Sequence, residues 1–326
     1  MDALPQFELL RPKSLAEVIE ARRAFPSSRL IGGGTDLLVN IRRGIGDAPD
    51  ALIDMNDVAE LSTVRHGGDG LIIGASVRIA DLAADEQVSS RFPAVSQAAG
   101  EIAGPIHRQM ATVGGNICLD TRCVYYNQSE WWREANDFCL KYQGVKCHVA
   151  PKSKVCFATF SGDLAAAALI YGAAVDIAGP DGERQLPLAD LYTGDGQNYL
   201  TLKAGEIITR LRLAAAPGMV SAYEKMRVRR SIDYPLAGVA VGLTRDGDTL
   251  SALRIAVTGT NPRPLRLTGC DDLCGGGLND KLFDSVDDLM RDQIMAMKTT
   301  FTPGHYRRRV AGALARRLVK RLFVEN

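Results

Sequence analysis

The segment of residues 111–156 constrains the fold of this chain more than any other stretch. It opens with a Gly-Gly-Asn turn at Gly114, Gly115 and Asn116, and it carries five of the seven cysteines. Residues 119–160 show no regular helical or strand period and are rich in Cys, Tyr, Trp, Lys and Asn. Long irregular segments are usually functional or disordered, and the aromatic content argues against disorder. We therefore expect an ordered functional loop inserted at about residues 119–160 of an otherwise regular α/β framework.

The thiols of this loop are predicted to bind a metal centre. No apolar run reaches membrane-span length and no signal-peptide pattern begins the chain, so we expect a cytoplasmic protein whose cysteines stay reduced. Successive cysteines are separated by gaps of four, fifteen, seven and eight residues, which match neither the paired units of zinc sites nor the ferredoxin spacings. An irregular loop can still wrap an iron–sulfur cube. The predicted ligands are the cysteines of the free loop: Cys123, Cys139, Cys147 and Cys156.

Other thiols and one histidine leave alternatives open. Cys118 follows the Gly-Gly-Asn turn, where we expect a strand to set its direction, and it remains a possible replacement for one of the four ligands. The alternative is that these cysteines are inert and buried, since free cysteine often packs as a small hydrophobic residue. Five cysteines in one short segment argue against that alternative. Cys270 and Cys274 are far away in sequence and are interpreted as structural. His148 is expected to be a surface or hydrogen-bonding residue, although it could ligate.

Two glycine turns predict a phosphate-binding site. Gly32, Gly33 and Gly34 follow a predicted strand at residues 29–31 and precede Thr35, Asp36 and an apolar helix start. Glycines let a ligand approach the backbone, and a helix N-terminus offers free N–H groups. The spacing is neither the dinucleotide fingerprint nor a P-loop, so a plain strand-to-helix turn is equally compatible with this motif alone. The second turn sits between Thr112 and Asn116, and the two together indicate a diphosphate held from both sides.

Periodicity and turn signals indicate an α+β protein of three parts. These are residues 1–56, residues 57–216 with the cysteine-rich insertion, and residues 217–326. In the first part a capping box at Ser14 and Glu17 predicts a helix to about residue 24. The expected strands lie at residues 50–54, 71–75, 173–178, 207–213, 221–226, 237–243 and 250–259. The expected helices begin near residues 76 and 161 or span residues 94–103, 285–297 and 306–323. Asp163 either caps the helix that begins near residue 161 or accepts hydrogen bonds from a ligand.

The net charge of the chain gives no indication of a nucleic-acid or membrane partner. Lysine and arginine total 39 against 38 acidic residues, so neither a nucleic-acid nor an anionic-membrane partner is indicated. The C-terminal segment is locally basic and is predicted to form the polar face of the last helix. Its basic residues are Arg307, Arg308, Arg309, Arg316, Arg317, Lys320 and Arg321.

Four motifs in this order resemble the FAD-binding subunits of the molybdenum hydroxylase family, which includes xanthine oxidase and carbon monoxide dehydrogenase. They are residues 31–36, residues 111–117, residues 162–164, and residues 223–225 with Arg229 and Arg230. The resemblance covers nearly the whole chain apart from the cysteine loop. It implies a two-subdomain FAD-binding domain followed by a C-terminal domain of antiparallel strands packed with helices.

The resemblance also implies roles for residues that match the family's motifs. The first turn would wrap the diphosphate and adenosine side of FAD, and the second turn would close over it. Ile102 and Ala103 would line the site, Asp163 would bind a polar group of the flavin, and Ile208 and Lys225 would lie near its ring. The remaining implied FAD-binding residues are Arg29, Leu30, Ile31, Gly32, Gly33, Gly34, Thr35, Asp36, Leu37, Ala111, Thr112, Gly115, Asn116 and Gly162.

The inserted cysteine loop is similar to that of one branch of the family, the flavin subunits of enzymes that reductively dehydroxylate 4-hydroxybenzoyl-CoA. That resemblance implies FAD plus a [4Fe–4S] cluster, reduced ferredoxin as electron donor, and partner subunits carrying the molybdenum cofactor and a [2Fe–2S] centre, assembled as a dimer of heterotrimers. No residue of this chain is expected to be catalytic, because the organic step belongs to the molybdenum subunit. The alternatives are the FAD subunit of an NAD-linked oxidative hydroxylase with a structural or zinc-binding loop, and a non-catalytic assembly protein of the same fold.

Overall fold

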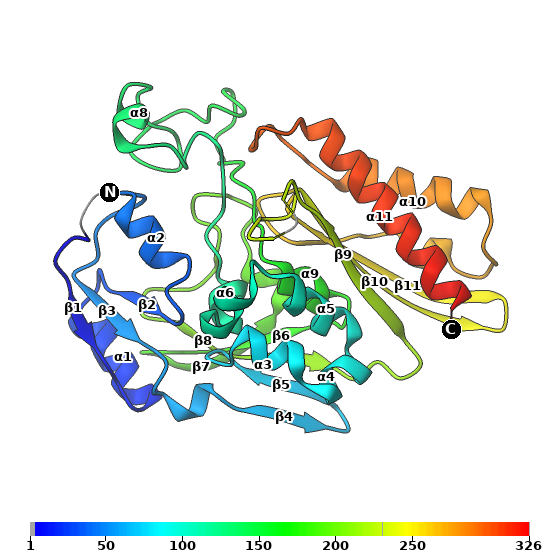
Figure 1. The fold of residues 1–326 in the computed structure, drawn as a ribbon, viewed down its shortest axis with the longest axis horizontal. Coiled ribbons are helices and arrows are strands. Elements are labelled where there is room, and N and C mark those ends of the chain that lie inside the picture. Colours follow the sequence, from blue (N-terminus) through cyan, green and yellow to red (C-terminus); the bar gives the residue numbers. More distant parts are fainter. Residues whose placement is uncertain (1–3, 230, 326) are drawn as a thin grey trace.

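The computed structural model describes residues 4–229 and 231–325, so Arg230 of the predicted arginine pair lies outside the described residues. Three sheets, each with its own helices, make up this part of the chain (Figure 1). The first two lie in the left and lower part of the view, and the third lies with the last two helices on the right. The α+β class predicted from the sequence is confirmed.

The N-terminal unit is a small parallel sheet with the strand order β1-β3-β2. Its strands are β1 (Glu8–Leu10), β2 (Arg29–Ile31) and β3 (Ala51–Asp54), and its helices are α1 (Leu15–Ala24) and α2 (Leu37–Arg42). The predicted cap of α1 is confirmed, because Ser14 Oγ accepts the Glu17 N–H at 3.2 Å. The Glu17 carboxylate reaches back to the N–H of Lys13 at 2.7 Å, one residue before the cap.

The second unit is a five-stranded antiparallel sheet in the order β4-β5-β8-β6-β7. The strands are β4 (Val64–Gly67), β5 (Gly70–Gly74), β6 (Ala174–Gly179), β7 (Gly182–Pro187) and β8 (Ile207–Ala214). The helices that pack with it are α3 (Ile79–Ala84), α4 (Glu86–Arg91), α5 (Pro93–Glu101), α6 (Pro105–Met110), α7 (Val113–Ile117) and α9 (Asp163–Leu169). Every residue of α9 is buried, so this alanine-rich helix forms the centre of the main core. The helix expected near residue 76 begins three residues later, at Ile79.

The C-terminal unit is an antiparallel sheet in the order β12-β11-β10-β9, covered by two long helices. Its elements are β9 (Val220–Met226), β10 (Ala237–Asp246), β11 (Thr249–Thr258), β12 (Leu265–Arg266), α10 (Asp280–Gln293) and α11 (Gly304–Val324). Helix α10 begins and ends earlier than predicted, because Asn279 Oδ1 accepts the Leu282 N–H at 2.8 Å and starts the helix there. Short 3₁₀ turns lie at Ala59–Leu61, Leu188–Leu191 and Asp271–Leu273.

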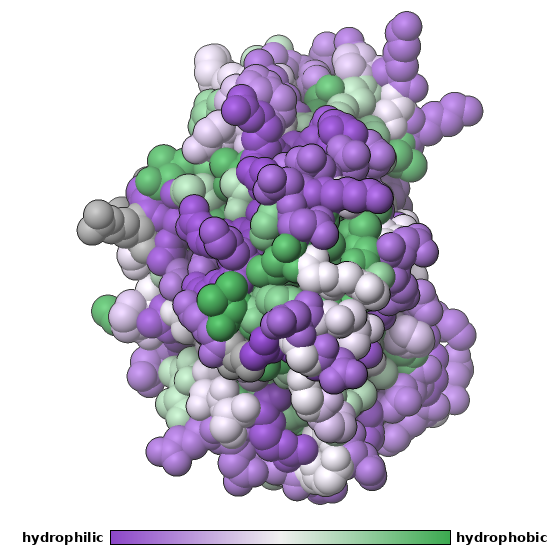
Figure 2. Space-filling view, turned by 90° about the vertical axis from the view of Figure 1, so that its right-hand side faces the viewer, coloured by the Kyte–Doolittle hydropathy of each residue, from purple (hydrophilic) through white to green (hydrophobic). Residues whose placement is uncertain are grey.

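Arg307 does not belong to the polar face of α11, so its prediction was wrong. Its side chain is completely buried, and burial lowers the pKa of its guanidinium to about 10. It donates to the carbonyls of Leu236 (3.0 Å), Met297 (3.0 Å) and Gly259. Of the other predicted basic residues of α11, Arg309, Arg316, Arg317 and Lys320 are exposed, and Arg308 and Arg321 are half-buried. The side of the molecule that carries α10 and α11 is mostly hydrophilic (Figure 2).

The cysteine-rich insertion is ordered but largely irregular, as predicted. Its one α-helix within the described residues is α8 (Glu130–Glu134), which lies at the top of Figure 1 above α2. Two backbone hydrogen bonds between Arg122 and Thr159 (2.8 and 2.7 Å) close the stem of the loop. Cys118 lies before this stem, where it caps the short helix α7; the expectation that a strand directs it was wrong. None of the helices in the described part of the chain is long and apolar enough to cross a membrane.

Candidate cofactor sites

The two glycine turns lie against each other. A Cβ atom on Gly32 would come within 2.6 Å of Thr112 Oγ1, and one on Gly33 would overlap the backbone carbonyl of Met110. Gly34 has φ +66°, a conformation that favours glycine. The contact between the turns therefore requires glycine at these positions, and it places both predicted phosphate-binding segments at one site.

The second turn is the first turn of a helix. Thr112 caps α7 and accepts the N–H of Gly115 at 3.2 Å, and Gly115 itself is exposed. Asn116 faces the third motif: its Oδ1 accepts the N–H of Leu164 at 3.1 Å, and a Cβ on Gly162 would come within 2.5 Å of the Asn116 carbonyl. The second and third motifs thus share one packed boundary.

A buried polar group joins the third motif to the fourth. Gly162, and not Asp163, is the N-cap of α9, so Asp163 does not cap this helix. Its Oδ1 accepts the hydroxyl of Tyr223 at 2.6 Å and lies 3.0 Å from the ammonium of Lys225. Burial raises the pKa of Asp163, and the Lys225 charge and the Tyr223 hydroxyl oppose that effect. The Lys225 side chain is fully buried, and its ammonium makes this ion pair without a well-directed hydrogen bond. The Lys225 ammonium can therefore still donate hydrogen bonds to another acceptor, such as a polar group of a ligand.

The remaining predicted FAD residues surround these groups. Residues 29–37 are half-buried or exposed, and Ala111 is half-buried. Ile102 and Ile208 are both 7 % exposed, the latter within β8. Ala103 adopts φ +44°, and its carbonyl accepts the N–H of Ile232 at 3.0 Å. The glycine contacts and the unsatisfied Lys225 ammonium fit an extended phosphate-bearing cofactor.

The four predicted cysteine ligands converge on one cavity. Cys123, Cys139, Cys147 and Cys156 line it together, and Cys118 does not. The enclosed space between the side chains is about 10 Å³, and it opens to solvent. The rest of the lining comes from Tyr125, Tyr126, Leu140, Lys141, His148, Val149 and Ala158. Residues separated by up to 33 positions in sequence thus meet at one point, and Cys270 and Cys274 lie outside it.

Burial disfavours the thiolate form of two of the four thiols, Cys123 and Cys156. Burial raises the pKa of Cys123 to about 11 and that of Cys156 to about 12, and the neighbouring thiols add to the effect. Backbone N–H groups oppose it, and Ala158 donates to Cys156 Sγ at 3.3 Å. A metal centre bound here would displace the thiol protons. His148 Nε2 lies 2.5 Å from the Phe138 carbonyl oxygen, a hydrogen-bonding role as expected. Among the described residues, no group of three or more His, Cys, Asp or Glu side chains is arranged to hold a metal ion.

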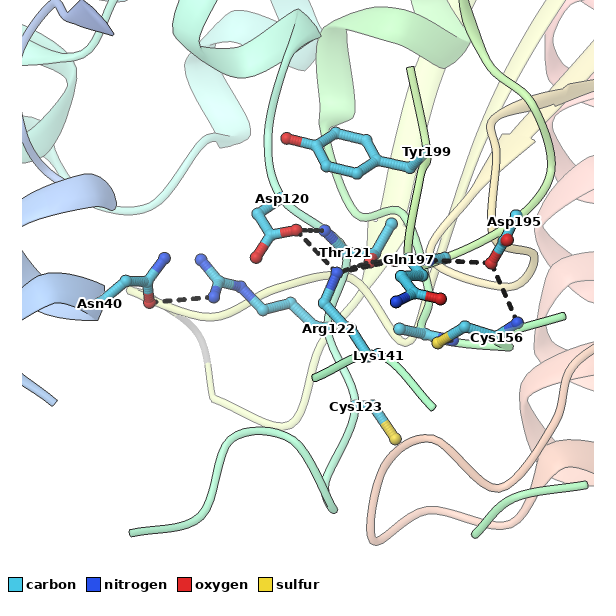
Figure 3. Close-up of polar contacts among 12 residues, drawn as sticks. Asn40, Asp120, Thr121, Arg122, Cys123, Lys141, Cys156, Asp195, Gln197 and Tyr199 are labelled. Atoms are coloured by element: carbon cyan, nitrogen blue, oxygen red, sulfur yellow. Dashed lines mark hydrogen bonds and ion pairs between the residues drawn. The ribbon is translucent and has the colours of Figure 1, made fainter. Parts of the chain in front are cut away.

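Polar side chains connect the loop to the N-terminal unit, and Figure 3 shows the contact of Arg122 with Asn40. Arg122, next to Cys123, donates to Asn40 Oδ1 (3.1 Å) and forms an ion pair with Asp36. Tyr234 also donates to Asp36 Oδ1 at 2.9 Å. Asp36 therefore binds the loop through its carboxylate, although its motif implied a role toward the cofactor.

Sequence reasoning missed several of these residues. Arg122, Lys141 and Tyr234 carry no motif of their own, and their partners lie far away in sequence. Tyr223 belongs to the fourth motif, but the motif implied no role for its hydroxyl. No signal in the sequence singles out Lys141, because the segment around it is itself rich in lysine.

The fold brings the two glycine turns into contact, as expected for a protein that binds an extended phosphate-bearing cofactor. The family model of the FAD-binding domain in molybdopterin dehydrogenase matches residues 5–215, and that of the carbon monoxide dehydrogenase flavoprotein C-terminal domain matches residues 221–322. The chain belongs to the FAD-binding subunits of the xanthine oxidase and carbon monoxide dehydrogenase family of molybdenum hydroxylases.

Individual relatives agree with this assignment. The aldehyde oxidoreductase FAD-binding subunit PaoB of Escherichia coli is 32 % identical over 86 % of this chain and 90 % of its own length. The carbon monoxide dehydrogenase medium chain of Hydrogenophaga pseudoflava is 30 % identical over 81 % of this chain and 78 % of its own. A solved structure of Cu,Mo-CO dehydrogenase superposes with a TM-score of 0.81 at 25 % identity, covering 99 % of this chain and 100 % of the other.

Proposed function

We propose that this chain is the flavin and iron–sulfur electron-transfer subunit of a molybdenum enzyme that reductively dehydroxylates 4-hydroxybenzoyl-CoA, the reaction of 4-hydroxybenzoyl-CoA reductase. The observation that carries the proposal is the convergence of Cys123, Cys139, Cys147 and Cys156 on one cavity at the edge of an FAD-binding fold. A one-electron centre beside a flavin is an electron-transfer arrangement. The overall change is the conversion of the phenol to benzoyl-CoA and water with two electrons and two protons.

The FAD-binding residues act through position and charge. We assign the diphosphate to the backbone of the first glycine turn and to the exposed surface of the second turn at Gly115, whose own N–H donates to Thr112 Oγ1. We assign a polar group of the flavin to the Asp163–Lys225 pair. Tyr223 holds Asp163 in place through its hydroxyl. When bound, FAD supplies both one-electron and two-electron chemistry. The chain's own residues orient it and exclude water from the side packed against α9.

We favour a [4Fe–4S] cluster over a zinc ion at the four thiols. Zinc sites, with Zn–S distances of about 2.3 Å, usually draw their ligands from paired cysteines close in sequence. Here the four thiols come from separate parts of a long irregular loop, with at least seven residues between successive cysteines. Amide N–H groups directed at sulfur, such as that of Ala158, are among the groups that tune iron–sulfur potentials.

The proposed partners are a molybdenum-cofactor subunit and a [2Fe–2S] subunit, in a cytoplasmic dimer of heterotrimers. The proposed electron donor is a reduced ferredoxin. Its docking surface would be the outer side of the cysteine loop, where Lys146, Lys152 and Lys154 are exposed and Val145 is 95 % exposed. Exposed positive charge complements an acidic carrier protein and steers its approach.

Metal and flavin analysis of the anaerobically purified protein tests the proposal directly. We expect about four iron and four acid-labile sulfide with one FAD per chain. FAD without iron would remove the cluster and favour an oxidative hydroxylase subunit. Stoichiometric zinc in place of iron would favour a structural role for the loop.

Three further measurements test the proposed electron donor and partner subunits. Deletion of the loop with retention of FAD and of full ferredoxin-driven activity would contradict the docking proposal. Fast flavin reduction by a nicotinamide would favour the NAD-linked oxidative alternative. Failure to co-purify with molybdenum and [2Fe–2S] subunits would favour a non-catalytic assembly protein.

A further inference from the structure

Lys141 is a buried cation in the wall of the cysteine cavity. Its side chain is only 5 % exposed, and it lines the same space as the four thiols. No carboxylate is among the described residues that line this space. The one fixed formal charge at the wall is therefore positive.

Its ammonium is held by three oxygen atoms. Lys141 Nζ lies 2.9 Å from Asp120 Oδ1, 2.7 Å from Thr121 Oγ1 and 2.7 Å from the Gly196 carbonyl. These acceptors use all three N–H groups, so the charge cannot swing away to solvent. The rings of Tyr126 and Tyr199 lie 5.0 and 5.5 Å from Nζ and stabilise the cation further.

The Lys141 ammonium joins the start of the loop, at Asp120 and Thr121, to the segment at Gly196 that contacts the end of the loop. Asp120 and Thr121 precede Cys123, while Gly196 follows Asp195, whose Oδ1 accepts the N–H of Cys156 at 3.0 Å. The N–H of Gly196 donates to the Cys156 carbonyl at 2.8 Å. Figure 3 shows the Lys141 side chain between the Asp120–Thr121 pair and the segments that carry Cys123 and Cys156. Lys141 is thus fixed relative to two of the four thiols.

The fixed positive charge of Lys141 stabilises negative charge on a metal centre that the four thiols bind. Four thiolates concentrate negative charge in a poorly solvated space, and each added electron increases it. The Lys141 side chain lines the same space as the four thiols, whereas Asp120, which pairs with its ammonium at 2.9 Å, does not line that space. In a low-dielectric site such an unbalanced charge acts strongly over a few ångströms.

We infer that Lys141 is a positioning residue that raises the reduction potential of the metal centre held by Cys123, Cys139, Cys147 and Cys156, and so favours entry of single electrons into the loop. The inference rests on the proposed [4Fe–4S] assignment. The electron would come from a one-electron carrier of the ferredoxin class, and the centre would gain one negative charge on reduction. Asp120 moderates the effect, because it partly neutralises the ammonium.

The test is a potentiometric titration of the anaerobically purified holoprotein, followed by EPR. For Lys141→Met we expect the ratio of reduced to oxidised cluster at a fixed potential to fall about tenfold, which is a shift of 59 mV for one electron. Lys141→Arg keeps the charge and should change the ratio less than threefold. Asp120→Asn removes the neutralising partner and should shift the potential in the opposite direction, which general loosening of the loop would not do.

The outcomes distinguish this inference from the proposed function. A wild-type protein without iron overturns both. A wild-type protein with four iron whose potential does not change in Lys141→Met overturns the role of Lys141 alone. If Lys141→Met fails to incorporate iron, Asp120→Asn decides: a rise in potential supports the inference, and an unchanged or lower potential overturns it. FAD content serves as the control for folding in each variant.

Discussion

The two candidate cofactor sites place their binding groups by opposite means. At the glycine turns the groups are backbone atoms positioned by regular elements, where the ends of β2, α7 and α9 pack together with no room for side chains. In the cysteine loop the groups are side chains on irregular backbone, held by specific polar contacts such as Arg122–Asp36 and Lys141–Asp120. Because the glycine turns are closely packed, we expect substitutions that add side-chain atoms to disrupt them. In the cysteine loop, we expect substitutions that remove a thiol or a polar contact to have the larger effect.

The largest expected effect concerns the thiols themselves. Cys147→Ser should remove essentially all iron from the protein, because a hydroxyl is a poor ligand for an iron–sulfur centre and no other thiol lines the cavity among the described residues. Cys118→Ser, whose thiol lies outside the cavity, should keep the full iron content. Iron and sulfide analysis measures both, and retention of iron in the first variant with loss in the second would reverse the assignment.

At the glycine turns the sensitive change is an added methyl group. Gly33→Ala would drive a Cβ into the carbonyl of Met110, so we expect the turns to separate and the FAD content to fall at least tenfold while iron is retained. Gly100→Ala is the matched control, because a Cβ there meets nothing within 4 Å. Flavin absorbance after gel filtration reports the result. Normal FAD content in Gly33→Ala would show that the contact between the turns is not needed for binding.

Arg307 holds together segments of the C-terminal unit and is connected through Thr299 to the base of the cysteine loop. Arg307→Met leaves buried carbonyls at Leu236 and Gly259 without a donor, at a cost of about 3 kcal/mol in the free energy of unfolding. Arg307 also donates to Thr299 Oγ1, and the carbonyl of Thr299 accepts the Val124 N–H at the base of the loop. Denaturant unfolding measures the loss, with the exposed Arg309→Met as control. A change below 0.5 kcal/mol would remove Arg307 from this role.

The smallest effect should come from the link between the regions. Arg122→Gln breaks the ion pair with Asp36 and should speed proteolytic cleavage within residues 124–150 a few-fold, with a smaller loss of FAD. Arg42→Gln, at an exposed position on the neighbouring helix, should change neither. Limited proteolysis with mass spectrometry gives the rates. A large FAD loss with no change in cleavage would mean that Asp36 serves the cofactor and not the loop.

Local signals in the sequence predicted the regular elements well. The Ser14 cap, the apolar strand at residues 207–213 and the alanine-rich helix at residue 163 are all present, because short-range hydrogen bonding and burial periodicity determine them. The errors occurred where a long-range contact overrides a local pattern. Arg307 looks like one more arginine of a basic helix, yet its guanidinium satisfies carbonyls from three separate segments.

The sequence by itself determined which groups can bind: the glycines that allow backbone contact, the thiols that can hold a metal centre, and the order of motifs that resembles the flavin subunits. Only the tertiary structure decided which of them meet. It separated Cys118 from the other four thiols, turned Asp36 toward Arg122, and enclosed Lys141 beside Cys156. The physical reason is that residue chemistry is local, whereas burial and charge pairing depend on which distant segments pack together.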